Sequence, residues 1–86
     1  MIMHKSESMR RRAVALPLPL ADRGRVWRVS AVVGGESSRR RLAELGFVAD
    51  TPVEVLQSND RDMVVVRLGE SRLAMASGMA NQVRVC

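Results

Sequence analysis

A single helical pattern interrupts the chain at Glu36-Ser-Ser-Arg-Arg-Arg-Leu-Ala-Glu-Leu-Gly46-Phe47. The pattern predicts a short helix over residues 37–45, whose first turn Ser37 or Ser38 can cap by accepting from an unpaired backbone N–H. Gly46 is expected to end the helix, because glycine adopts a left-handed conformation without steric cost. That ending brings Phe47 opposite Leu42, the apolar contact typical of such a terminus.

The predicted helix is amphipathic. Leu42 and Leu45 lie three residues apart and share a face, while Arg39, Arg40 and Arg41 fill much of the rest. Arg40 is expected to reach Glu44 one turn further on, an exposed pair worth only about 0.2–0.5 kcal/mol. A helix this short is not stable in isolation, so it needs a sheet to pack against.

The flanking segments carry strand patterns. Residues 25–33 are rich in valine and place Trp27, Val29, Ala31 and Val33 on one face. Residues 51–57, 63–68, 71–75 and 82–86 are further short strands, and Gly69-Glu70 fits a two-residue hairpin turn. Residues 77–80 form a single helical turn that Ser77 caps. These elements predict a mainly β fold: a small SH3-like β-barrel of about five strands, with one short helix after the first strand and a helical turn before the last.

Length and charge divide the 86 residues into two parts. Residues 1–15 show no periodicity and are expected to form a flexible basic N-terminal arm, and residues 16–86 form one domain. Residues 1–12 carry +3 of the net charge of +5, which leaves the rest of the chain at +2. No apolar run approaches the roughly 20 residues of a membrane span.

The start of the domain has two interpretations. Arg10–Arg12 followed by the apolar residues 13–21 resembles a secretory signal, but Pro17 and Pro19 interrupt the run and Asp22 follows it at once. The favoured interpretation is an apolar lead-in, with Leu16, Leu18 and Leu20 packing on the domain.

The pattern from Arg40 onward is similar to a known family. The run Arg40-Arg-Leu-Ala-Glu-Leu-Gly-Phe-Val-Ala-Asp-Thr-Pro-Val-Glu-Val-Leu56 resembles the core signature of the FeoA family, small cytoplasmic accessory proteins of bacterial ferrous iron uptake. Gly69–Met75 and Ala80–Val85 are similar to that family's second hairpin and closing strand. The family usually has glycine where Asp50 stands, and aspartate tolerates the same positive φ in a turn.

The resemblance implies an SH3-like barrel that binds the cytoplasmic GTP-binding part of the ferrous iron transporter FeoB. It implies a cytoplasmic protein that is associated with the membrane through this partner. The expected contact surface is the arginine face of the helix with its apolar neighbours: Arg39, Arg40, Arg41, Leu45 and Phe47. Two alternatives stay open at this point, a small basic nucleic-acid-binding barrel and a metal-responsive regulatory domain. The near-neutral charge of the domain and its two aromatic residues argue against specific nucleic-acid binding.

The residue inventory argues against catalysis. His4 lies in the arm and Cys86 ends the sequence, so no Cys–His or Ser–His–acid set forms inside the barrel. The same scarcity argues against a metal site within one chain, because closed zinc sites use about four ligands, and no cofactor is required. Zinc or ferrous iron at a site shared by two molecules, as in a homodimer, has only weak candidate ligands: His4, Glu7, Asp22, Glu44 and Cys86.

Overall fold

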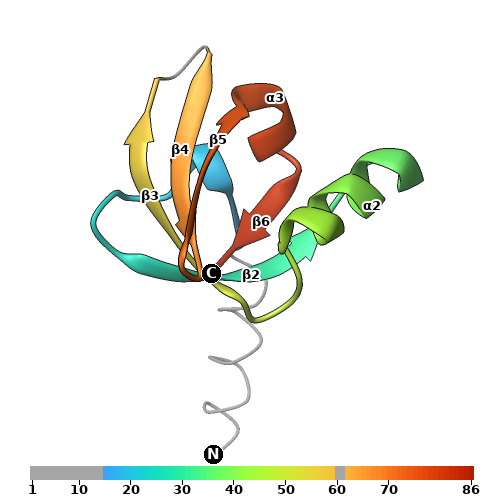
Figure 1. The fold of residues 1–86 in the computed structure, drawn as a ribbon, viewed down its shortest axis with the longest axis horizontal. Helices are drawn as coiled ribbons and strands as arrows, with labels where there is room; N and C mark the ends of the chain where they lie inside the picture. Colours follow the sequence, from blue (N-terminus) through green and yellow to red (C-terminus); the bar gives the residue numbers. More distant parts are fainter. Residues whose placement is uncertain (1–14, 60–61) are drawn as a thin grey trace, which may run out of the picture.

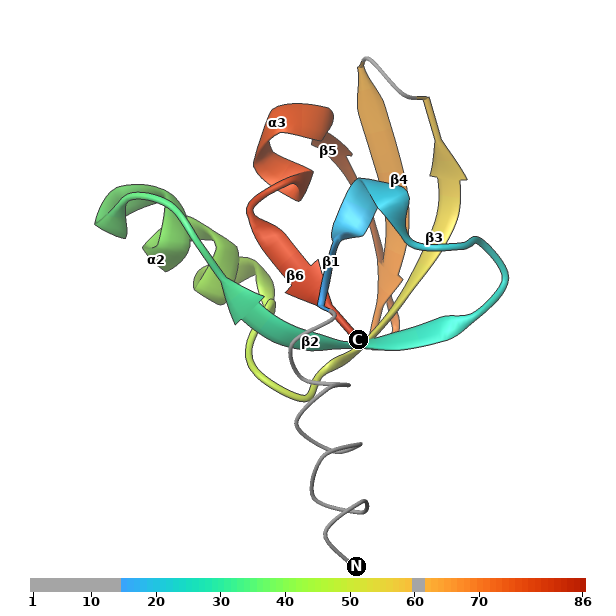
Figure 2. The ribbon, with the colours of Figure 1, turned by 180° about the vertical axis from the view of Figure 1, so that it is seen from behind.

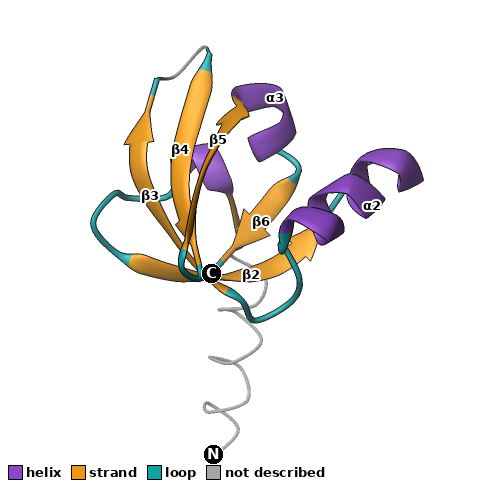
Figure 3. Ribbon diagram, viewed as in Figure 1, coloured by secondary structure: helices purple, strands orange, loops and turns teal. Residues whose placement is uncertain are grey.

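The computed structural model describes residues 15–59 and 62–86, and the predicted arm lies outside this part apart from Ala15. The described chain forms one antiparallel sheet of six strands in the order β1-β6-β2-β3-β4-β5, with short helices between strands (Figures 1 and 3). The elements are β1 (Leu16–Pro17), the 3-10 helix η1 (Leu18–Leu20), β2 (Val26–Val32), α2 (Glu36–Leu45), β3 (Pro52–Ser58), β4 (Met63–Leu68), β5 (Ser71–Ala76), α3 (Ser77–Ala80) and β6 (Val83–Val85).

Strand β2 joins the two halves of the curled sheet. Its first residues, Val26 to Arg28, pair with β3, and its later residues, Val29 to Val32, pair with β6. The two halves therefore curve around a common interior, as Figures 1 and 2 show from opposite sides. This interior holds one apolar cluster of buried residues: Leu18, Ala21, Trp27, Val29, Leu42, Phe47, Val53, Val55, Val64, Val66, Leu68, Met75, Ala80, Val83 and Val85.

The predicted inner face of β2 is correct only for its first half. Trp27 and Val29 are buried, but Ala31 and Val33 are exposed. The pairing with β6 skips Ser30, so Val29 faces Val85 whereas Ala31 faces Arg84. Such a bulge inserts one residue and moves every later side chain to the opposite face of the strand. After the bulge it is consequently Val32, and not Val33, that is partly buried on the inner face of the strand.

Strand β3 contains a second register shift, between Val55 and Gln57. Val53 and Val55 point inward, and after the shift it is Ser58 that pairs with buried Val64. The Ser58 hydroxyl is buried and has no hydrogen-bond partner in the described part of the chain. The bulge thus explains why a polar side chain follows two valines into the barrel.

The lead-in packs on the domain through Leu16 and Leu18 but not, as predicted, through Leu20, and it adds a sixth strand that its sequence does not reveal. Leu16 pairs with Val85 and Pro17 with Arg84, so β1 extends the sheet beyond β6. Leu18 is fully buried, while Leu20 points outward with 68% of its surface exposed. Two residues that include a proline are too few for a period to be recognised.

The hairpin turn between β4 and β5 and the short helix α3 lie where they were predicted, with one difference in capping. Leu68 pairs with Ser71 around Gly69-Glu70, and of these two turn residues only Gly69 has positive φ. At α3, however, Ala76 is the N-cap and no side chain caps the helix, so the predicted capping by Ser77 is wrong. The Ser77 backbone N–H instead donates to the carbonyl of Asp62, which ties α3 to the start of β4.

Candidate functional site

Helix α2 projects from the barrel beyond the end of β2, and its C-terminus is fixed by a glycine ending (Figure 1). The Gly46 N–H donates to the carbonyl of Ala43 and the Phe47 N–H donates to the carbonyl of Leu42, both over 3.0 Å. Gly46 has φ of 113°, so the predicted left-handed ending is confirmed. Leu42 and Phe47, both buried in the same cluster, anchor this end of the helix.

The start of α2 differs from the prediction. The helix begins at Glu36, one residue earlier, with Gly35 as the N-cap and no side-chain cap from Ser37 or Ser38. The Arg39 N–H closes the first turn on the carbonyl of Gly35. Glu36 in the first turn is favourable, because its negative charge lies at the positive end of the helix dipole.

The three arginines of α2 do not lie on one face. Successive residues are about 100° apart around a helix, so buried Leu42 fixes the orientation of the rest. Arg41 and Leu45 share one flank of the helix, Arg39 lies on the other flank, and Arg40 points directly away from the barrel. Arg40 pairs with Glu36 at 3.6 Å rather than with Glu44, and both side chains are largely exposed. The predicted Arg40–Glu44 pair is therefore replaced by one with glutamate on the N-terminal side, the better orientation.

The apolar part of the expected contact surface needs one correction. Phe47 has only 1% of its surface exposed, so it stabilises the helix end and is not available to a partner in this conformation. Leu45 is exposed to 44%, and Val48, just beyond the helix, to 51%. Val48 was not anticipated, because neighbouring Phe47 offered a larger apolar side chain in the same motif. Exposed apolar side chains at this end of α2 are thus Leu45 and Val48.

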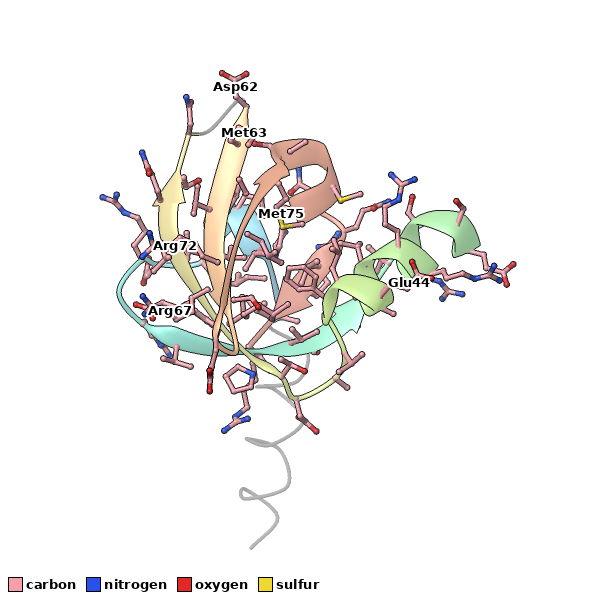
Figure 4. The ribbon with its side chains drawn as sticks, viewed as in Figure 1. Glu44, Asp62, Met63, Arg67, Arg72 and Met75 are labelled. Atoms are coloured by element: carbon pink, nitrogen blue, oxygen red, sulfur yellow. The ribbon has the colours of Figure 1, made fainter. Side chains whose placement is uncertain are left out.

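The candidate metal ligands are not brought together by the fold. Asp22 precedes β2, Glu44 lies on α2, and Cys86 follows β6 (Figure 4 shows Glu44). All three are exposed, and residues 15–59 and 62–86 contain no cluster of three His, Cys, Asp or Glu side chains able to hold a metal ion. His4 and Glu7 lie outside the described residues. Within the described residues, no helix is both long and apolar enough to cross a membrane.

Comparison with models of known protein families identifies the family of this chain. The family model described as the FeoA domain matches residues 16–86, which includes every described strand and helix. This chain belongs to the FeoA family. The match starts at β1, so the short lead-in strand is part of the FeoA domain. A comparison with curated proteins found no match.

Solved structures support both the family and the fold. An iron uptake regulatory protein, FeoA, is similar with 26% identity and a TM-score of 0.76, over 84% of this chain and 96% of that one. A zinc-complexed FeoA from Stenotrophomonas maltophilia, described as a prokaryotic SH3 domain protein, has 26% identity and a TM-score of 0.70, over 80% of this chain and 87% of that one. The SH3-like barrel is therefore confirmed.

A third similar structure is a manganese-dependent transcriptional repressor, with 20% identity and a TM-score of 0.75. The likeness covers 84% of this chain but only 41% of the repressor. At this identity the similarity concerns the fold alone. The metal-responsive alternative consequently gains support from a shared fold and from nothing else.

Proposed function

We propose that this chain is a non-enzymatic accessory module of bacterial ferrous iron uptake, which binds the cytoplasmic GTP-binding part of a FeoB-type transporter. Membership of the FeoA family, together with similar structures named for iron uptake, supports this role. The observation that carries the binding proposal is helix α2, which projects from the barrel and has one buried residue, Leu42, among its ten. A protruding element of this kind is accessible to a partner on most of its circumference.

The contact surface within α2 follows from the orientation of its side chains. Arg41 and Leu45 share a flank, and Val48 adds exposed apolar area beyond the helix end. Arg41 makes no ion pair within the described part of the chain, so its guanidinium can engage a carboxylate in a bidentate contact. We call Arg41, Leu45 and Val48 the helix surface. An apolar anchor next to an arginine is the composition typical of interface hot spots.

The test measures binding to the isolated GTP-binding part of the FeoB-type transporter from the same organism. Arg41→Glu is expected to weaken binding at least about tenfold, since like charges facing each other at an interface can cost several kcal/mol. Arg41→Lys should recover only part of the affinity, because a lysine ammonium does not reproduce the bidentate geometry. Arg72→Glu applies the same change of charge on the opposite side of the barrel and should leave binding unchanged.

Unfolding of each variant is measured alongside, because loss of binding through loss of folding would say nothing about the contact. Exposed charge changes rarely alter the free energy of unfolding by more than about 0.5 kcal/mol. The helix surface is excluded as the contact if Arg41→Glu and Leu45→Ser both bind like the parent protein. Absence of binding by the parent protein itself would exclude the FeoB partner.

A metal is not needed for this function. Zinc or ferrous iron at a site shared by two copies stays a prediction, and the zinc-complexed relative makes a metal plausible. Two of its five candidate ligands, the Cys86 thiol and the Glu44 carboxylate, are exposed at positions from which they can meet a second molecule. Sedimentation with and without equimolar zinc tests it, and the Cys86→Ser and Glu44→Gln variants identify the ligands. A zinc-induced dimer that both variants retain would rule these residues out.

A further inference from the structure

A row of side chains crosses the outer face of the sheet on the side opposite α2. Val26 faces Glu54 across β2 and β3, Glu54 faces Arg67 across β3 and β4, and Arg67 faces Arg72 across β4 and β5. Residues directly opposite each other in neighbouring strands project from the same face of a sheet. Figure 4 shows Arg67 and Arg72 on one side of the molecule and Glu44 of α2 on the other.

Only one of the two arginines in this row is paired with an acidic side chain among the described residues. Arg67 Nη1 lies 3.3 Å from Glu54 Oε1 and donates a hydrogen bond to it. Arg72 is exposed and makes no ion pair with any residue in 15–59 or 62–86. Its cross-strand neighbour is Arg67, and like charges directly opposite each other are destabilising. A carboxylate from outside the chain would relieve this repulsion.

An apolar hollow lies beside the arginine pair. A shallow pocket of about 130 Å³ is lined by Val26, Pro52, Val53, Glu54, Arg67 and Gly69. Val26, at its edge, has 63% of its surface exposed, so the hollow continues into an exposed apolar side chain at the end of the row. A cavity of about 150 Å³ holds a benzene molecule, so this pocket has room for one aliphatic side chain.

We propose that this face, the hairpin surface (Val26, Pro52, Glu54, Arg67 and Arg72), binds an extended acidic segment of a protein partner. One aliphatic side chain of the segment enters the pocket and a carboxylate pairs with Arg72. Four neighbouring strands span about 14 Å, and an extended chain advances about 3.3 Å per residue. The aliphatic residue and the acidic residue are therefore about three to four positions apart in the segment.

The arrangement favours a protein segment over a nucleic acid or an anionic membrane. Glu54 stands in the middle of the row with 23% of its side chain exposed, so a continuous chain of phosphates laid across the face would meet its carboxylate, whereas a segment with an aliphatic residue at this point would not. The row contains no aromatic side chain on which a base could stack. The pocket beside this row and the uncompensated Arg72 within it instead match one anchor and one acid. This binding goes beyond the proposed transporter contact, because it uses the opposite side of the barrel.

The experiment uses the full chain and a fluorescein-labelled peptide, Gly-Ser-Leu-Ser-Gly-Glu-Glu-Gly. Two control peptides replace the leucine by serine or both glutamates by glutamine. The protein variants are Arg72→Glu, Val26→Thr and, as a control of equal charge change on α2 outside the helix surface, Arg40→Glu. Val26→Thr retains the β-branched side chain that suits a strand, and Arg72→Glu creates opposite charges across from Arg67, so both variants should keep the unfolding temperature of the parent.

The parent protein is expected to bind the peptide, with a dissociation constant below about 1 mM. Arg72→Glu should lower the affinity at least about tenfold and Val26→Thr about threefold or more, while Arg40→Glu changes it less than about twofold. Both control peptides should bind at least about tenfold more weakly. The proposal is overturned by absence of binding up to about 1 mM, or by equal losses for Arg40→Glu and Arg72→Glu, which would indicate general charge attraction. Tighter, Arg72-dependent binding to phosphatidylserine vesicles or to single-stranded DNA would also overturn it. None of these outcomes tests the proposed transporter contact, because Arg72→Glu is the variant that is expected to leave binding to the transporter unchanged.

Discussion

The backbone N–H of Phe47 donates to the carbonyl of Leu42 over 3.0 Å, across the left-handed residue Gly46. This bond and the parallel one from Gly46 to Ala43 satisfy carbonyls that the last turn of α2 would otherwise leave unpaired. The same turn directs the Phe47 side chain into the core. One glycine thereby fixes both the end of the helix and its attachment to the barrel.

Gly46→Ala is consequently expected to destabilise the protein by at least about 1 kcal/mol, since a residue with a Cβ is strained at this positive φ. An added Cβ would also lie 3.0 Å from Leu68 Cδ2, so the leucine must shift. Urea denaturation monitored by Trp27 fluorescence measures the effect. Gly78→Ala in α3 is the control: it has open space around it and should stabilise by about 0.5–1 kcal/mol. A neutral Gly46→Ala would contradict the conformational argument.

Asp50 is the only described residue other than glycine with positive φ, at 71°. Its backbone N–H donates to the Val29 carbonyl over 2.8 Å, and its own carbonyl accepts from Arg28 Nη1 over 2.8 Å. These contacts use backbone atoms of Asp50, so they survive a change of its side chain. The two hydrogen bonds therefore hold the turn between α2 and β3 in the same backbone conformation, whichever residue occupies position 50.

We therefore expect Asp50→Gly to be about 0.5 kcal/mol more stable than the parent, because relief of strain exceeds the added entropy of the unfolded chain. Asp50→Val should be less stable by about 1 kcal/mol or more, because a β-branched residue is strongly disfavoured at this φ. The midpoints of urea unfolding rank the three proteins. A valine variant as stable as the glycine variant would show that φ at this position is not the determining factor.

Local patterns predicted the parts of the fold that depend on neighbours in sequence. The Leu42-x-x-x-Gly46-Phe47 spacing predicted the helix ending, and Gly69-Glu70 predicted the hairpin between β4 and β5. These features follow from the conformational freedom of single glycines, which does not depend on tertiary contacts. The number and shortness of the predicted strands favoured a small barrel, and the FeoA-like signature implied the same fold.

Features set by pairing between distant strands could not be predicted in this way. The bulge at Ser30 depends on β6, more than fifty residues later, and the bulge in β3 depends on its register with β4. Each bulge reversed the inward and outward faces for the residues that follow. The hairpin surface was missed for the same reason, since Val26, Glu54, Arg67 and Arg72 are separated in sequence and only their registers place them in one row.

Nucleic-acid binding provides a separate test of the module as a protein-binding domain. Binding to mixed-sequence DNA is expected to be weak and to fall steeply with salt, because it would depend on counterion release rather than base contacts. Deleting residues 1–12 removes +3 of the net charge of +5 and should abolish most of this binding. Fluorescence anisotropy at several salt concentrations measures both effects. A salt-resistant, sequence-selective complex of the shortened protein would argue for the nucleic-acid-binding alternative.

The three arginines of α2 should contribute unequally to iron uptake, although they are adjacent in sequence. Arg41 lies beside the exposed Leu45 and makes no ion pair in the described chain, whereas Arg40 faces away from the barrel and pairs with Glu36 at 3.6 Å. Arg39 lies on the other flank, next to Ala43. Reversal of charge by Glu should therefore reduce uptake most at Arg41, less at Arg39 and least at Arg40.

Uptake of radioactive ferrous iron by cells that carry each variant gives the ranking, with expression levels and unfolding temperatures measured in parallel. All three substitutions change the net charge equally, so a general electrostatic effect would reduce uptake by the same factor in each. Arg39→Glu combined with Arg40→Glu should then be less damaging than Arg41→Glu alone, even though it reverses two charges instead of one. If the double variant is instead the more damaging one, the partner contacts the outward face of α2, because Arg40 points away from the barrel on that face.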